Sequence, residues 1–307
     1  MKSIEELKSE LKNEMSYNEI LGMAKKKGLK QEFYSKEDII NWLLQNGLTW
    51  KEYELNYNPY ITLKLHICKF FKIKKGWTVM DIGCGSCGTS VAAASLVGSK
   101  GRVIAVDQSE EEMIRCTNYI EQVGFKEIIE TRLANVLNLE FENNYFDMIL
   151  LLYSPQFLGY SENLKEVLLK VKNWTPRLGI ADHVPVPSTY DESIYLLLNW
   201  LSNDVARICI ERKTDRLFHP EEVRSTLSMT GWKIVKEKKF KVSKKNVWPE
   251  WAMKDNIKRL SKQIQKLKDP IYKEILNSRL RTIKNLTEKG FMPKPTLMFA
   301  AVAERQV

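Results

Sequence analysis

Apolar and polar residues along the chain change their spacing near Trp77. Before that point the apolar residues recur every three or four positions, as in "IEELKSELKNEM" and "SKEDIINWLLQNG", which is the period of amphipathic helices. Ser35 followed by Asp38 fits a capping box at the start of one such helix. Residues 1–70 are therefore expected to form an N-terminal helical segment.

Short apolar runs alternate with helical stretches after Trp77. Strands that alternate with helices at this spacing predict an α/β fold, with a largely parallel sheet and helices on both of its faces. Two further strands are expected after the alternation ends, at 232–240 and 295–304. The alternating part predicts strands at 77–82, 102–107, 128–134, 147–152 and 178–184, and helices at 87–98, 110–123 and 162–174.

Two helical inserts interrupt the later part of the chain. The first contains the amphipathic stretch "YDESIYLLLNWLSNDVARICIE", and Pro270 is expected to divide the second into two helices. Both are rich in apolar and aromatic side chains, which suits an enclosed pocket. The expected organisation is a core of residues 71–240 with 295–307, and inserts at 185–218 and 241–294 that form a substrate cap.

A glycine-rich turn follows the first expected strand. Gly83, Gly85 and Gly88 fit the pattern G-x-G-x-x-G, and Asp107 ends the next strand, where a nucleoside ligand needs a carboxylate for its ribose hydroxyls. Asp81 stands two residues before the first glycine, where it would repel a pyrophosphate and attract a cation. S-adenosylmethionine (SAM) carries an ammonium and a sulfonium, so the turn is expected to hold SAM rather than a dinucleotide.

Four segments in this order resemble the core of class I (Rossmann-like) SAM-dependent methyltransferases: "VMDIGCG", "VIAVDQS", "LANVLNLEFENNYFDMILLLYS" and "WTPRLGIADHV". The resemblance covers residues 70–184 well and implies a seven-stranded, doubly wound sheet whose last strand is antiparallel. It also implies methyltransferase activity, with SAM as cofactor and S-adenosylhomocysteine as product. The residues that match the cofactor-binding positions of the family are Asp81, Gly83, Gly85, Asp107, Gln108, Asn135, Val136 and Tyr153.

The sequence departs from the family pattern at the end of the glycine turn. Cys87 stands where a third glycine is usual, and Gly88 comes one position late. The turn is thus expected to be slightly redrawn around these two residues.

Candidate catalytic residues follow the fourth and fifth expected strands, because sites in open parallel sheets lie at the carboxyl ends of strands. His183 is the candidate general base, since its ordinary pKa lies near neutrality, and Tyr153 is the candidate to orient the acceptor. Purely structural roles for both side chains stay open, because methyl transfer needs mainly alignment and exclusion of water. Tyr57 and Tyr60, just before the core, are candidates to close over SAM.

The five cysteines have irregular spacing in a chain long enough to bury a large core, so no disulfide framework is expected. Cys84 and Cys87 form a C-x-x-C pair, for which a zinc half-site or a redox pair is an alternative, but no second pair completes a tetrahedron. The favoured interpretation is small residues that fit a tight turn, and no metal site is expected.

The composition is that of an ordinary globular protein, with 44% hydrophobic and 28% charged residues. No apolar run is long enough to cross a bilayer and no signal peptide is evident, so a soluble cytoplasmic protein is expected. The net charge of +10 is concentrated in residues 233–294, which hold 19 Lys and Arg against 6 Asp and Glu. This segment either meets an anionic partner or is a solvated helical surface.

Three functions are compatible with these patterns. The favoured one is methyl transfer from SAM to a small molecule enclosed under the helical cap. The alternative is an RNA or protein methyltransferase that docks its substrate on the basic 233–294 segment; "SPQF" (154–157) is a degenerate form of a motif found in methyltransferases that act on exocyclic base amines. The third is a SAM-binding protein without catalytic activity.

Overall fold

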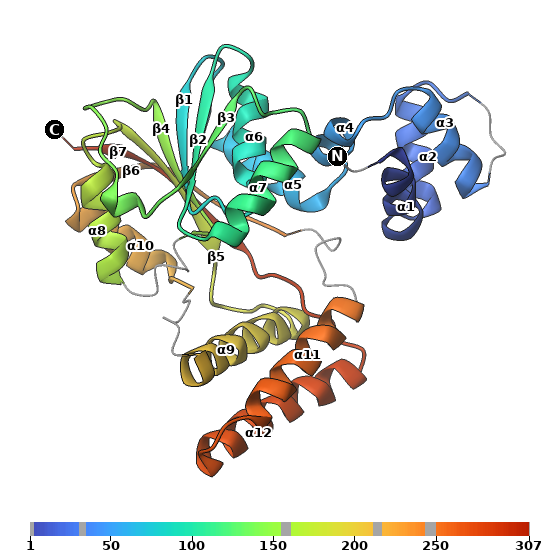
Figure 1. Cartoon of the computed structure of the whole chain (residues 1–307). Helices are drawn as coiled ribbons and strands as arrows, with labels where there is room; N and C mark the ends of the chain where they lie inside the picture. The colour runs from blue at the N-terminus through green and yellow to red at the C-terminus, as the bar shows by residue number, and fades with distance from the viewer. Residues whose placement is uncertain (1–2, 31–34, 155–160, 211–216, 243–249, 307) are drawn as a thin grey trace.

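A computed structural model describes residues 3–30, 35–154, 161–210, 217–242 and 250–306, and its centre is a seven-stranded sheet (Figure 1). The strand order is β3-β2-β1-β4-β5-β7-β6. Strands β1 to β5 run parallel, and β7 is antiparallel to both of its neighbours. The strands are β1 (Thr78–Ile82), β2 (Arg102–Asp107), β3 (Ile129–Leu133), β4 (Met148–Leu152), β5 (Arg177–His183), β6 (Trp232–Phe240) and β7 (Met298–Arg305). The predicted fold class is confirmed, including the antiparallel last strand.

Helices cover both faces of the sheet, because successive strand residues point to opposite sides. Val79 and Met80 of β1 show the alternation: the first belongs to the apolar cluster under one set of helices and the second to the cluster under the other. One face is covered by α5 (Pro59–Phe70), α6 (Gly88–Val97) and α7 (Glu110–Gln122), and the other by α8 (Ser161–Val171) and α10 (Pro220–Met229).

The N-terminal helices have an apolar cluster of their own, which includes Leu11, Ile39 and Trp50. The capping box predicted at Ser35 is confirmed: its hydroxyl accepts a hydrogen bond from the Asp38 N–H, and the Asp38 carboxylate accepts one from the Ser35 N–H. The helices are α1 (Ile4–Glu14), α2 (Tyr17–Lys26), α3 (Lys36–Gln45) and α4 (Trp50–Asn56). The first three stand to one side of the sheet, and α4 and α5 connect them to it (Figure 1).

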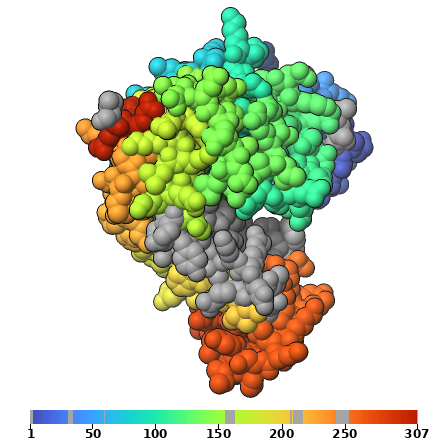
Figure 2. Space-filling model, turned by 60° about the vertical axis from the view of Figure 1, so that its left-hand side comes forward, coloured from blue at the N-terminus to red at the C-terminus, as the bar shows by residue number. Residues whose placement is uncertain are grey.

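Three long helices form a second group beyond the carboxyl end of β5. They are α9 (Tyr190–Ile210), α11 (Glu250–Gln265) and α12 (Pro270–Glu288), and they share one apolar cluster. Pro270 begins α12, as predicted. The α11 and α12 pair projects from the lower end of the molecule in Figure 2. No described helix is both long and apolar enough to cross a membrane, and the role of this group as a substrate cap stays a prediction.

The strand order reverses at β1, which lies between β2 and β4. In an open parallel sheet the crevice at such a reversal, beyond the carboxyl ends of the strands, is where ligands bind. The segments that follow β1, β2, β4 and β5 therefore meet at one edge of the sheet.

Candidate functional site

The turn after β1 requires glycine for two separate reasons. Gly83 and Gly85 have φ angles of +67° and +52°, a region that other residues enter only with strain. A Cβ atom on Gly83 would also lie 2.6 Å from the Cβ of Ser154, which follows β4. The backbone of the turn and the segment after β4 are thus in direct contact.

Asp107, at the end of β2, orders this turn. Its Oδ2 accepts a hydrogen bond from the Gly85 N–H at 2.9 Å, and its Oδ1 accepts one from the Ser109 N–H at 2.9 Å. A carboxylate has about four acceptor positions, so this partly buried group has the capacity to accept two hydroxyl donors as well. That is the chemistry the ribose position requires.

Asp81 is fully buried beside the turn. Its Oδ2 accepts a hydrogen bond from the Ser90 hydroxyl at 2.6 Å, whereas its Oδ1 and the Ser154 Oγ are buried with no hydrogen-bond partner among the described residues. Burial raises the pKa of Asp81 to about 7, although Ser90 and Lys64 oppose the shift. Buried polar atoms without partners are costly, so an ammonium group would fit here. The site is therefore compatible with the amino-acid end of SAM.

Lys64 of α5 is a site residue that the sequence did not point to. Its Nζ lies 2.6 Å from the place where a Cβ on Gly88 would be, and 5.3 Å from the ring centroid of Tyr153. Burial lowers the pKa of Lys64, and the Asp81 carboxylate opposes that change. A single lysine in an amphipathic helix carries no pattern that would mark it as a site residue.

The two predicted catalytic residues lie next to each other. The rings of Tyr153 and His183 are 5.3 Å apart, and the Tyr195 ring of α9 lies 5.5 Å from the His183 ring on an edge-to-face geometry. Tyr153 has a left-handed backbone, with φ at +60°, and its N–H donates to the Ala181 carbonyl. Strained backbone of this kind is concentrated at functional sites.

The protonation of His183 is determined by its surroundings. Burial lowers its pKa to about 4, so the ring is neutral near pH 7. Its Nδ1 lies 3.0 Å from the Thr296 carbonyl oxygen, which can only accept a hydrogen bond. We therefore assign the proton to Nδ1, which leaves Nε2 as an acceptor.

A cavity of about 740 Å³ joins the turn to these aromatic residues, a volume typical of small-molecule sites. Lys64, Gly88, Tyr153, His183 and Tyr195 are all among the residues that line it, and so is Tyr60. Tyr57 instead packs against the cluster of N-terminal helices.

The residues expected around the adenine lie on the β2–β3 side of the turn. Val136 is buried in the core, whereas Gln108 and Asn135 are exposed. The Asn135 side chain accepts a hydrogen bond from the Leu137 N–H and so caps the short 3-10 turn Val136–Asn138. Contact of these three residues with an adenine stays a prediction, and residues 155–157 of "SPQF" lie outside the described part of the chain.

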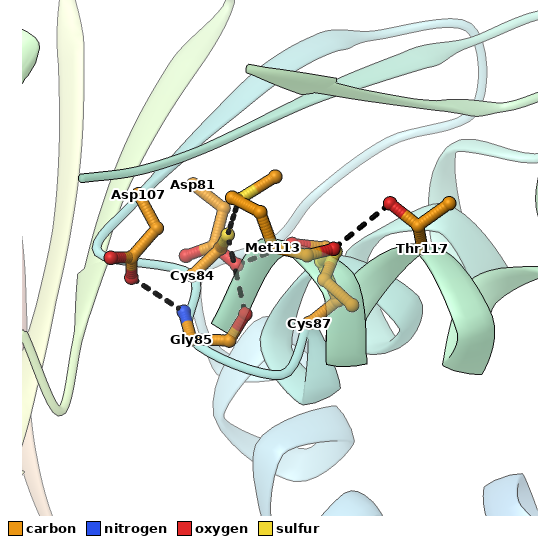
Figure 3. Close-up of a disulfide and its surroundings, with 9 residues drawn as sticks. Asp81, Cys84, Gly85, Cys87, Asp107, Met113 and Thr117 are labelled. Atoms are coloured by element: carbon orange, nitrogen blue, oxygen red, sulfur yellow. Dashed lines mark hydrogen bonds between the residues drawn. A yellow bond between two sulfur atoms is a disulfide. The ribbon is translucent and has the colours of Figure 1, made fainter. Parts of the chain in front are cut away.

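The sequence analysis expected no disulfide framework and did not foresee the single disulfide that Cys87 and Cys116 form. They are 29 residues apart in sequence, but α7 packs beside the glycine turn and brings their Cα atoms to 4.9 Å. Cys84 lies next to this bond (Figure 3), and burial together with Asp81 and Asp107 raises the pKa of its thiol. An odd number of irregularly spaced cysteines excludes a framework of bridges but not a single bridge between neighbouring elements.

The sheet order, with the antiparallel last strand and the glycine turn after β1, is that of a class I methyltransferase fold. The chain belongs to the methyltransferase-domain family, whose profile matches residues 73–248, more than half of its length.

Among known proteins, the chain is 28% identical over 145 residues to the demethylmenaquinone methyltransferase of Bacillus pumilus (strain SAFR-032), a match that covers 45% of this chain and 60% of that protein. The match thus covers less than two thirds of the length of these demethylmenaquinone methyltransferases.

Two solved structures share the fold at low sequence identity. The cyclopropane-fatty-acyl-phospholipid synthase-like protein of Lactobacillus casei has a TM-score of 0.65 at 14% identity, with 80% of this chain and 90% of that chain covered. The YcgJ protein of Bacillus subtilis has a TM-score of 0.50 at 14% identity, with 80% and 98% covered. At this identity the similarity shows the fold alone.

Proposed function

We propose that this protein transfers the methyl group of SAM to a small molecule held in the cavity beside Tyr153 and His183. The observation that carries the proposal is the pair of carboxylates at the glycine turn. Asp81 offers a buried oxygen without a partner to a cation, and Asp107 offers a carboxylate to hydroxyl groups. A pyrophosphate coenzyme would be repelled by the first of these.

The residues around the turn would each bind a different part of the cofactor. Asp81 and Ser154 would bind the ammonium group, and Asp107 the ribose hydroxyls. The carboxylate of the SAM amino-acid end would lie between the N-terminus of α6 and Lys64, since helix N-termini attract anions. The adenine would lie against Val136, with Gln108 and Asn135 at its edge.

SAM supplies a methyl group that is already activated for displacement, so the protein mainly has to align the acceptor and exclude water. Tyr153 and Tyr195 would hold the acceptor between their rings. The His183 Nε2 would accept a hydrogen bond from the nucleophile and so orient its lone pair. With a pKa of about 4, this imidazole is a weak base, which favours an acceptor whose proton leaves readily.

The walls of the cavity favour a flat, largely apolar acceptor. Tyr60, Tyr153 and Tyr195 present aromatic rings to it, and such rings stack well on unsaturated ones. A quinol-type ring, like that of the compound named in the matched demethylmenaquinone methyltransferases, fits this description and is the first acceptor class to test.

The test is transfer of tritiated methyl groups from SAM into a cell extract that is then fractionated by size. Label in the low-molecular-weight, solvent-extractable fraction supports the proposal. Label in RNA or protein supports the macromolecular alternative, and SAM binding without any transfer supports a non-catalytic protein. Tyr153→Ala, which removes the ring, and His183→Asn are expected to reduce transfer about 10-fold or more. Asp147→Asn, a change at the opposite end of β4, should leave transfer per folded molecule unchanged.

A further inference from the structure

Four sulfur atoms gather behind the glycine turn. The Sγ atoms of Cys84, Cys87 and Cys116 all lie within 4.8 Å of one another. The Cys84 Sγ also lies 3.9 Å from the Sδ of Met113 (Figure 3). Met113 precedes Cys116 by three residues in α7, so the two share one face of this helix. None of the four side chains is more than 7% exposed. The sulfurs therefore form one buried cluster supplied by the turn and by α7.

We propose that this cluster binds one soft, thiophilic metal ion of the Cu(I) class when the Cys87–Cys116 disulfide is reduced. Thiolate and thioether ligands select Cu(I), zinc and iron–sulfur centres over hard cations. Within the part of the chain that the structure describes, no imidazole or carboxylate joins the three cysteines in this cluster. The nearby thioether of Met113 favours Cu(I) over zinc, which prefers thiolate and imidazole ligands.

The spacing of the sulfurs is compatible with shared coordination. Metal–thiolate bonds of about 2.3 Å place the sulfurs of one site about 4 Å apart, within the observed spread of the three Sγ atoms. Cys87 is also the N-cap of α6, a helix of ten residues. The positive end of the helix dipole stabilises a thiolate there.

The disulfide and the metal ion exclude each other. A two-electron reduction by a dithiol converts the Cys87–Cys116 bond to two thiols, and the dithiol becomes a cyclic disulfide. Binding of the ion then releases the thiol protons as the cysteines become thiolates. In the absence of metal, thiol–disulfide exchange with a small-molecule disulfide restores the Cys87–Cys116 bond, converts that reagent to two thiols, and leaves Cys84 as the one free thiol of the cluster.

The large cavity gives the ion a route to the cluster. Ser86 and Gly88, on either side of Cys87, line this cavity, and so does Arg115, which precedes Cys116. An ion that enters from this side would connect the glycine turn to α7 in place of the disulfide.

The test is an anaerobic titration of reduced protein with Cu(I) in the presence of a coloured Cu(I) chelator, bathocuproine disulfonate. The protein is first reduced with a dithiol and passed through a desalting column. We expect transfer of one equivalent of Cu(I) to the reduced protein and none to the oxidised protein. Cys84→Ala and Cys116→Ala should weaken binding by about 100-fold or more, and Met113→Leu, which keeps the side-chain volume, by less.

Cys68→Ala is the matched control, because Cys68 is an equally buried free cysteine outside the cluster. This variant should bind Cu(I) like the unchanged protein. The proposal is overturned if reduced protein takes no Cu(I) from the chelator, if oxidised protein takes as much, or if Cys68→Ala loses binding together with Cys84→Ala. The comparison of reduced and oxidised protein needs no variant to fold. A parallel titration with Zn(II) tests the choice of ion, and tighter binding of Zn(II) overturns it.

Discussion

The Asp107 carboxylate accepts a hydrogen bond from the Gly85 N–H at 2.9 Å, so the end of β2 holds the glycine turn that follows β1. One side chain thereby orders the turn and occupies the position expected for the ribose-binding acid. Loss of this carboxylate should affect both the backbone of the turn and the cofactor.

Asp107→Ala is expected to weaken SAM binding by about 10- to 100-fold, because hydrogen bonds to a charged group are lost. Isothermal titration measures the dissociation constant. The control is Asp147→Asn: the Asp147 Oδ2 accepts a hydrogen bond from the Thr78 N–H at the start of β1, so this variant should lose stability and keep its affinity for SAM. Equal affinity for SAM in both variants would contradict the assignment of Asp107 to the cofactor site.

Gly83→Ala is expected to destabilise the fold by about 1–2 kcal/mol for the left-handed backbone and by about 1–3 kcal/mol more for the contact with Ser154. Gly124→Ala isolates the first effect. Gly124 has a φ angle of +68°, and a Cβ atom there meets nothing within 4 Å. Urea unfolding of the two variants gives the difference, and a SAM titration should show weaker binding for Gly83→Ala alone.

The burial of His183 makes stability depend on pH. Its pKa is lowered to about 4 in the folded protein, against about 6.5 in the unfolded chain. Between these values the folded state binds fewer protons, so stability falls as the pH drops through the window, by up to about 3 kcal/mol.

Asp81 acts in the opposite direction, because its raised pKa makes the folded state bind more protons as the pH drops from about 7. The His183 effect is therefore measured as a difference between the unchanged protein and His183→Asn, in which an amide N–H can replace the donor to Thr296. Urea unfolding at pH 7 and pH 5 should show a larger loss for the unchanged protein. Equal losses would contradict the buried neutral imidazole.

The pKa of Asp81 also predicts how SAM affinity changes with pH. Below pH 7 this carboxyl is largely protonated in the free protein, and a bound ammonium favours the ionised form. Affinity should rise about fivefold between pH 6 and pH 7, with release of a proton that titrations in two buffers detect. Asp81→Asn should show weaker binding and no proton release. A flat profile in the unchanged protein would argue against contact between Asp81 and the ammonium.

The lysine-rich surface of α11 and α12 can be tested for binding to nucleic acid. Lys254, Lys258 and Lys262 line a surface groove of about 750 Å³ together with Lys284 of α12. If the protein methylates a small molecule, these lysines only form a solvated surface that keeps the protein soluble. Bulk tRNA should then bind weakly or not at all in a filter assay. Tight binding with a steep dependence on salt would instead support the alternative of an RNA substrate.

The regular elements could be predicted closely from the sequence. The strand predicted at 102–107 is β2 without change, and Pro270 begins α12 as expected. These elements follow local patterns of apolar spacing and helix-start residues, which the sequence displays directly.

The site could be predicted only in part. Asp81, Asp107, Tyr153 and His183 could be named as candidates because strand ends and glycine turns carry a sequence signal, and their roles in binding and catalysis stay predictions. Lys64 and the Cys87–Cys116 bond were not found, because they arise where α5 and α7 pack beside the turn. Contacts between helices that are distant in sequence have no local pattern.

The hydrogen bond between His183 and Thr296 joins the two ends of the long segment that connects β5 to β7. Between these residues lie α9, α10, β6, α11 and α12. The hydrogen-bond partner of the imidazole therefore lies where the chain returns to the sheet, and of the inserted helices α9 adds the edge-to-face contact of Tyr195. Because β5 and β7 are paired at His183 and Met298, changes within the intervening helices should leave this hydrogen bond, and with it the tautomer of His183, in place.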